Sequence, residues 1–152
     1  MPTCDTKFHG AISFEPEQVL QVPSGLFGFS EEKQFLLLEL PSARPLVFVQ
    51  SIRSAALCFI ALPAQVIDPA YQLSLNEYDL EAFGYAAQAV PAMGKDLLCL
   101  ALLVIDESRA TANLRAPLVI DIAAHRGRQM IVNGSYSHQH PLPAPRFTQR
   151  AN

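Results

Sequence analysis

The histidine pair near the C-terminus is the first place where residue types and spacing could support chemistry. His138 and His140 stand two positions apart in "SHQH". Side chains at this spacing point to one face of an extended segment, where two imidazoles could share a metal ion. A protein metal site needs further ligands, and no cysteine or carboxylate stands beside the pair. The sequence therefore predicts no metal site.

A nucleophile and a phosphate-binding loop are the next candidates, and both lack their motif. Ser24 in "PSGLFG" has no glycine two positions earlier, as a nucleophile elbow requires. The stretch "GYAAQAVPAMGK" does not end in Gly-Lys-Ser or Gly-Lys-Thr, as a phosphate loop does. The remaining carboxylates are scattered, and we expect them on the solvated surface: Glu31, Glu32, Asp79, Glu81, Asp106 and Glu107. We therefore predict that the protein is not an enzyme and holds no cofactor.

Composition limits the kinds of partner. Hydrophobic residues make up 50% of the 152 residues, and charged residues only 16%. A chain with so few charges tends to expose apolar surface, and such surface often meets a partner. The formal net charge is -3, whereas nucleic-acid-binding proteins carry a basic excess that neutralises phosphates. This balance argues against direct RNA or DNA binding and favours a basic protein partner.

Cysteine usage and hydropathy indicate the compartment. Cys58 and Cys99 lie in apolar runs, so we expect reduced thiols in the core, and Cys4 makes the count odd. The lack of a disulfide framework favours a reducing compartment. The N-terminus shows no secretory signal pattern, and the longest apolar run, Leu97 to Ile105, is shorter than the about 20 residues that span a bilayer. We expect a cytoplasmic protein that does not enter a membrane.

Short apolar segments between turn-forming residues dominate the chain. Their length and their content of β-branched and aromatic residues predict strands. The "KFHGAISF" segment has a central glycine and is expected as a bulged or edge strand, and "LLCLALLVIDE" could also form a helix because it lacks β-branched residues before Val104. The predicted strands lie in "KFHGAISF", "EQVLQV", "QFLLLEL", "PLVFVQSI", "LCFIALP" and "LLCLALLVIDE", followed by a hairpin in "APLVIDIAAHRGRQMIVNGSY" that turns near His125 to Gly127.

The spacing of these segments predicts the architecture. Consecutive strands joined by tight turns pair antiparallel. We therefore predict a mainly β protein, a small antiparallel β-barrel-like single domain over residues 1–152 with one or two short helices. The proline-rich end is expected to form a flexible tail from about residue 141.

The best helix signal lies in "LSLNEYDLEAFGY". Ser74 or Asn76 can cap its N-terminus, and Glu77 and Asp79 favour the positive end of the helix dipole. Gly84 supplies a C-terminal stop. The segment therefore predicts a short helix against the sheet.

Two connecting segments, the "PSGLFGFS" turn and the one that contains Asn113, carry residues with an expected structural role. The "PSGLFGFS" turn places Phe27 and Phe29 beside glycines, and we expect both rings to close one end of the barrel rather than to meet a partner. Asn113 is expected in a connection between two core strands, where its side chain bonds neighbouring backbone groups. Pro117 then keeps Ala116 extended.

The order of these segments resembles the FliW family of bacterial flagellar assembly factors. The resemblance runs from about Phe8 to Pro143 and rests on "VPSGLFGF", "PLVFVQSI", "TANLRAPLVIDIAAHRGRQMIV" and "SYSHQHPLP". The motif positions, expected to be partner-binding, are Pro23, Gly25, Leu26, Gly28, Phe29, Gln50, Ser51, Thr111, Asn113, Leu114, Pro117 and Gln129.

The resemblance implies a regulatory binding protein. FliW proteins bind CsrA, a basic RNA-binding dimer, and so relieve its repression of flagellin translation, while flagellin competes for FliW. If the Glu31–Glu32 pair or the turn from Asp79 to Glu81 faces CsrA, charge reversal there would slow association at low salt. The alternative is a barrel that binds a small ligand or a flavin, because an antiparallel barrel has an apolar interior.

Overall fold

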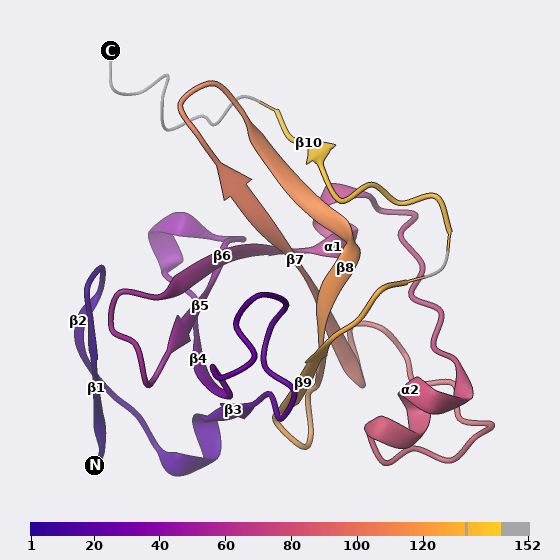
Figure 1. Cartoon of the computed structure of the whole chain (residues 1–152), viewed down its shortest axis with the longest axis horizontal. Coiled ribbons are helices and arrows are strands. Elements are labelled where there is room, and N and C mark those ends of the chain that lie inside the picture. The colour runs from indigo at the N-terminus through magenta and orange to yellow at the C-terminus, as the bar shows by residue number, and fades with distance from the viewer. Residues whose placement is uncertain (133, 144–152) are drawn as a thin grey trace.

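Seven strands close into a barrel. The computed structural model describes residues 1–132 and 134–143 (Figure 1). The ring follows the order β8-β7-β6-β5-β4-β3-β9, and β9 pairs again with β8. Pairing is antiparallel except between β3 and β9, which run parallel at Gln21 and Arg126. The strands are β3 (Leu20–Gln21), β4 (Gln34–Leu38), β5 (Val47–Ser51), β6 (Cys58–Pro63), β7 (Leu97–Ile105), β8 (Ala110–Asp121) and β9 (Arg126–Gln129). The predicted mainly β, barrel-like fold is confirmed.

The interior of the barrel is filled by apolar side chains. Alternation along each strand sends every second residue inward, as Phe35 and Leu37 show on β4, while Leu36 points outward. Burial of each such side chain contributes about 1.5–3 kcal/mol. The buried interior residues are Leu20, Val22, Leu26, Phe35, Val47, Val49, Ala61, Leu100, Leu118 and Ile120.

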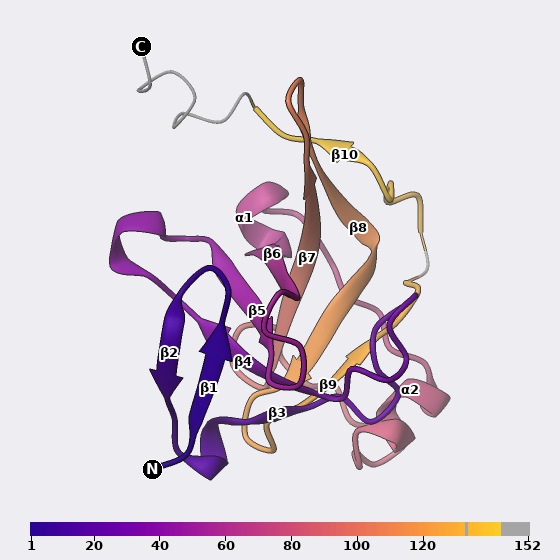
Figure 2. The ribbon, with the colours of Figure 1, turned by 60° about the vertical axis from the view of Figure 1, so that its left-hand side comes forward.

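A separate hairpin covers the outer face of β4. It consists of β1 (Thr3–Thr6) and β2 (Gly10–Ser13), followed by a short 3-10 helix, η1 (Pro16–Gln18) (Figure 2). Cys4 packs with Phe14 and Leu36 beneath it. The strand predicted within residues 7–14 is confirmed only over β2, because the Thr6 hydroxyl closes a turn before it by donating to the Gly10 carbonyl at 2.7 Å. The predicted strand in "EQVLQV" is confirmed only over β3, because Glu17 and Gln18 belong to η1.

The outer face of β7 and β8 packs against the segment that holds both α-helices, α1 (Ala64–Ile67) and α2 (Glu77–Ala82). The predicted helix is confirmed, and Asn76 is its cap. The Asp79 amide donates to Asn76 Oδ1 at 2.8 Å, and the Asn76 amide donates to an Asp79 carboxylate oxygen at 3.3 Å. Phe83 packs beside Tyr71 and outward-facing residues of β7 and β8. The helix therefore encloses a second hydrophobic core outside the barrel.

Strands β7 and β8 continue beyond the barrel as an arm (Figure 1). Strand β7 is confirmed as a strand, which removes the helix alternative. The turn from β8 to β9 falls at residues 122–125, slightly before the predicted position, and His125 has a φ of 51° there. A short strand, β10 (His140–Pro141), pairs with β8 along the arm.

The structure describes only the first residues of the predicted C-terminal tail. The predicted flexible tail begins where β10 lies, and its residues 144–152 are outside the described residues.

No helix in the described part of the chain has the length and hydropathy that a membrane crossing needs. Within that part all cysteines are free thiols, with Cys4 and Cys99 buried and Cys58 half-buried.

Burial of Cys99 makes the free energy of unfolding depend on pH in the alkaline range. Burial raises its thiol pKa from 9.0 to about 12, and it also raises the phenol pKa of Tyr71. The unfolded chain therefore loses these protons at lower pH than the folded protein does. For Cys99 the stabilisation is complete below about pH 9 and declines up to about pH 12, by at most about 1.4 kcal/mol per pH unit, and the contribution of Tyr71 declines only from about pH 10 upward.

Urea unfolding at several pH values tests this expectation. Cys99→Ala should lower the slope of the unfolding free energy against pH between about pH 9 and 11, whatever it does to the value at pH 7. Equal slopes in the parent protein and the variant would contradict the assignment.

Candidate functional site

The loop at residues 22–33, between β3 and β4, contains the first group of motif positions. It is the dark purple loop at the centre of Figure 1. Gly25 has a φ of 67°, and a Cβ there would lie 2.6 Å from the Phe29 carbonyl oxygen and from Ser30 backbone atoms. Leu26 and Phe29 exchange backbone hydrogen bonds of 3.2 and 2.7 Å around Gly28, whose φ is 82°. Glycine is therefore required at position 25 for both conformation and space.

The aromatic side chains of this loop are exposed. Phe27 is 54% exposed and Phe29 is 41% exposed, whereas Leu26 is 2% exposed. The prediction that both rings close the barrel end is wrong, because Leu26 fills the interior and the tight turn sends its neighbours outward. Phe29 packs edge-on against Phe59 of β6, with ring centroids 5.2 Å apart. The loop thus presents two aromatic side chains to solvent.

Gln129 on β9 joins this loop to β8. The Phe27 amide donates to its Oε1 at 2.7 Å, and its Nε2 donates to the Ala116 carbonyl at 3.0 Å. One side chain therefore holds two segments that are far apart in the sequence. Gln129, one of the predicted motif positions, therefore helps to position the loop that carries Phe27 and Phe29.

Removing this side chain should loosen the loop. We expect Gln129→Ala to lower the free energy of unfolding by about 1 kcal/mol and to speed hydrogen exchange at the Phe27 amide. Urea unfolding and NMR hydrogen exchange measure the two effects. Gln72→Ala is the matched control, because Gln72 is exposed and its side chain makes no hydrogen bond to the described residues. Unchanged exchange at Phe27 would contradict the role of Gln129.

Asn113 organises a bulge inside β8. Leu100 and Leu102 of β7 pair with Leu118 and Asn113, so residues 114–117 lie opposite one residue. Asn113 Oδ1 accepts the amides of residue 115 at 3.1 Å and Ala116 at 2.9 Å. The predicted backbone bonding is confirmed, but the placement between strands is wrong because β8 already begins at Ala110. The bulge accommodates Pro117, which lacks an amide for the ladder.

Gln50 and Ser51 form the second group of motif positions. Gln50 is fully buried, and its Nε2 donates to the carbonyls of Ser51 at 3.0 Å and Leu57 at 3.2 Å, within the β5–β6 connection. The Ser51 hydroxyl donates to Glu32, which also accepts from the Ser54 hydroxyl at 2.9 Å. Glu32 is 9% exposed, so its predicted place on the solvated surface is wrong.

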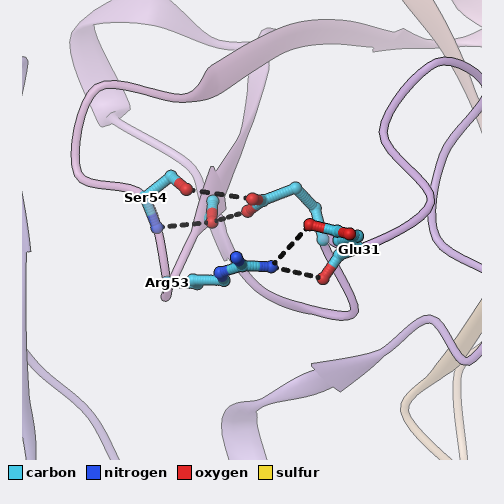
Figure 3. A network of polar contacts seen from close by, with 5 residues as sticks. Glu31, Arg53 and Ser54 are labelled. Carbon is cyan, nitrogen blue, oxygen red and sulfur yellow. Dashed lines mark hydrogen bonds and ion pairs between the residues drawn. The ribbon is translucent and has the colours of Figure 1, made fainter.

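The carboxylate beside this network faces solvent. Arg53 Nη1 lies 3.5 Å from a Glu31 carboxylate oxygen and 3.3 Å from the Glu31 carbonyl (Figure 3). Both side chains of the ion pair are mostly exposed. Sequence reasoning grouped Glu31 with Glu32, and nothing local in the sequence separates them. The difference arises because Ser51 and Ser54 approach only one of the two in the folded chain.

A groove next to Phe29 is the candidate binding surface. It has a volume of about 330 Å³, and its lining includes Phe59, Val104, Thr111 and Asn113. Val104 is 67% exposed on the arm. We call this groove, together with the exposed rings of Phe27 and Phe29, the Phe29 surface. It combines apolar side chains with hydrogen-bonding groups, a composition typical of polypeptide binding.

The structure divides the predicted site residues by location. The Phe29 surface contains Phe29, Thr111 and Asn113. Leu114 is buried, and its carbonyl accepts the Tyr71 hydroxyl at 2.8 Å. The positions that support the backbone around this surface or lie in the core are Gly25, Leu26, Gly28, Gln50, Ser51, Leu114, Pro117 and Gln129, whereas Pro23 is exposed beside a small pocket that Phe83 and Arg126 also line. Phe27, Phe59 and Val104 are among the members that sequence reasoning did not place at a site.

The predicted histidine pair does not converge. His138 lines the groove of the Phe29 surface, while His140 lines a different groove on the other side of the arm. Within the described part of the chain, no three histidine, cysteine or carboxylate side chains gather in a way that could hold a metal ion. The surface therefore offers contacts for a partner and no assembled ligand set.

Comparison with known proteins gives the family. The FliW protein family model matches residues 3–142. Flagellar assembly factor FliW of Oceanobacillus iheyensis is 29% identical over 144 residues, covering 93% of this chain and 94% of that protein. The proteins of the same name from Bacillus subtilis and Geobacillus sp. WCH70 are 31% and 32% identical, each covering 90% of this chain.

A solved structure agrees with these matches. The crystal structure of a flagellar assembly factor FliW superposes with a TM-score of 0.81 at 30% identity, covering 93% of this chain and 98% of that one. Fold, sequence and the match to the family model over almost the whole chain agree, and the chain therefore belongs to the FliW family.

Proposed function

We propose that this chain is a cytoplasmic, single-domain regulator of flagellar assembly that switches between two polypeptide partners. It binds CsrA and thereby relieves repression of flagellin translation, and it is sequestered when flagellin binds. The relatives named flagellar assembly factor support the broader role in assembly. The Phe29 surface is the observation that supports polypeptide binding most directly.

Charge and hydropathy support the choice of partners. The chain has a net charge of -3, which suits a basic partner such as CsrA better than a nucleic acid. Exposed aromatic side chains such as Phe27 and Phe29 are typical of interface centres, where aromatic residues contribute most of the binding energy, and Phe29 packs against Phe59 in the groove lining. An amphipathic flagellin segment would bury such a surface.

The alternative of a flavin or small ligand inside the barrel has less support. The described interior positions are occupied by apolar side chains, among them Phe35, Leu100 and Leu118, which are fully buried. A ligand in the lumen would have to displace several of them. The grooves that the described residues form lie outside the barrel.

Binding experiments with purified proteins test the proposal. We expect the full chain to form a complex with CsrA and another with flagellin from the same organism, both measurable at micromolar concentration by calorimetry. Flagellin should lower the amount of CsrA bound if the two compete. The proposal fails if neither complex forms at that concentration.

Charge reversal tests which carboxylates face CsrA. Glu32 is buried and Asp79 caps α2, so Glu31→Lys and Glu81→Lys are the variants that leave the fold intact. We expect Glu31→Lys, beside the Phe29 surface, to slow association at low salt severalfold, with little effect of Glu81→Lys. Stopped-flow measurements at two salt concentrations record the rates. Unchanged rates for both variants would exclude these carboxylates from the interface.

A further inference from the structure

A second groove on the arm contains none of the family motif positions. It has a volume of about 560 Å³ and lies between α1, the tip of the β7–β8 arm, the β10 segment and the connection from β4 to β5. We call it the Arg44 groove. Its apolar lining comprises Ala43, Pro45, Leu46, Leu62, Val66, Ile67, Leu103, Ile105, Ala110, Pro141, Leu142 and Pro143.

The Arg44 groove and the Phe29 surface lie on opposite faces of the arm. Val104 pairs with Thr111, and both line the Phe29 surface. The next pair, Ile105 with Ala110, lines the Arg44 groove. Adjacent cross-strand pairs point to opposite faces of a two-stranded ribbon. Leu103 of the arm lines both grooves, so an occupant of one groove leaves most of the other face of the arm accessible.

The charge at the Arg44 groove selects for an anion. Among the described residues that line it, Arg44 and His140 are the only ionisable ones, and none carries a carboxylate. The ion pair found among the described residues joins Arg53 to Glu31, so Arg44 has no carboxylate partner there. A guanidinium at the mouth of an apolar groove favours an occupant that carries a carboxylate beside apolar side chains.

Exposed apolar side chains at the rim favour a large occupant. Val66 is 53% exposed and Ile105 is 39% exposed. A small ligand inside the groove would leave both in water, whereas a polypeptide would cover them. The chain's own C-terminal residues follow Pro143 but carry Arg146, Arg150 and no acidic side chain. Their basic side chains would oppose Arg44 rather than complement it.

We propose that the Arg44 groove is a second docking site, which binds an apolar polypeptide segment bearing carboxylates independently of the Phe29 surface. The apolar side chains of the segment enter between α1 and the arm. A carboxylate of the segment pairs with Arg44. The protein would then hold two polypeptides at once, one on each face of the arm.

Two synthetic helical peptides test the proposal with the full-length protein. Both have leucines at helical spacing, and they differ only in carrying glutamates or lysines beside the leucines. Fluorescence anisotropy should show that the glutamate peptide binds about tenfold more tightly. Arg44→Glu should reverse this preference, and Val66→Asp should weaken both peptides about tenfold.

Control variants test whether peptide binding depends on the Arg44 groove itself. Arg126→Glu and Val90→Asp alter exposed positions outside the groove and should change nothing. Phe27→Asp should leave peptide binding intact, so a failure of CsrA or flagellin binding is distinguishable from a failure here. The proposal is overturned if both peptides bind with the same affinity or if Arg44→Glu has no effect. It is also overturned if dodecanoate displaces the peptide at a lower concentration than the peptide itself needs to bind. A second copy of this chain buried in the groove would overturn it as well.

Discussion

Gly25→Ala should lower the free energy of unfolding by about 3 kcal/mol. The left-handed conformation at this position costs any residue with a Cβ about 1 kcal/mol. The new Cβ would also lie 2.6 Å from backbone atoms of Phe29 and Ser30, which cannot rotate away as a flexible side chain can. Forcing them apart adds about 2 kcal/mol, in the range of overpacked cores.

Gly28→Ala provides the matched control for this prediction. Gly28 has a φ of +82°, but no atom lies within 4 Å of a Cβ built there. Only the conformational cost remains, so we expect a loss of about 1 kcal/mol. Urea unfolding monitored by circular dichroism compares the two variants. Equal losses would show that the close approach at Gly25 relaxes at no cost.

Phe27→Asp should weaken binding of at least one polypeptide partner about a hundredfold, or about 2.7 kcal/mol. Phe27 is 54% exposed, and the described structure holds it through its backbone bond to Gln129. The substitution therefore removes an exposed aromatic ring and adds a charge without opening the core. Calorimetry with CsrA and with flagellin measures the loss for each partner.

Val90→Asp is the control for Phe27→Asp. Val90 is 92% exposed in the connection between α2 and β7, outside the Phe29 surface. It introduces the same charge at another apolar position and should leave both affinities unchanged. Parent-like affinity of Phe27→Asp for both partners would remove the Phe29 surface from the proposed function. Parallel urea unfolding shows whether either variant is destabilised.

Local signals account for the elements that the sequence predicted correctly. The helix begins at Asn76 because its side chain accepts the amide of Asp79, a contact between residues that are close in the chain. Strand β4 was recognisable because "QFLLLEL" is a short apolar run between breakers. Such signals act between residues that are close in the chain. The residues that determine each of these elements can therefore be recognised in the sequence itself.

Long-range contacts account for the errors. Glu32 is buried because Ser51 and Ser54, far along the chain, donate to it. Phe27 and Phe29 are exposed because Leu26 takes the interior position and Gln129 fixes the loop from β9. No pattern within the loop itself contains either piece of information.

The sequence by itself determined the family, the strand content, the cap of α2 and the acidic, charge-poor character of the chain. These properties depend on composition and on residues near one another. Only the tertiary structure decided which motif positions lie at the Phe29 surface and which support the backbone, because closing the barrel brings the loop, the β8 bulge and β9 together. It also decided that the arm has a groove on each face, since strand register sets the direction of every side chain on the arm.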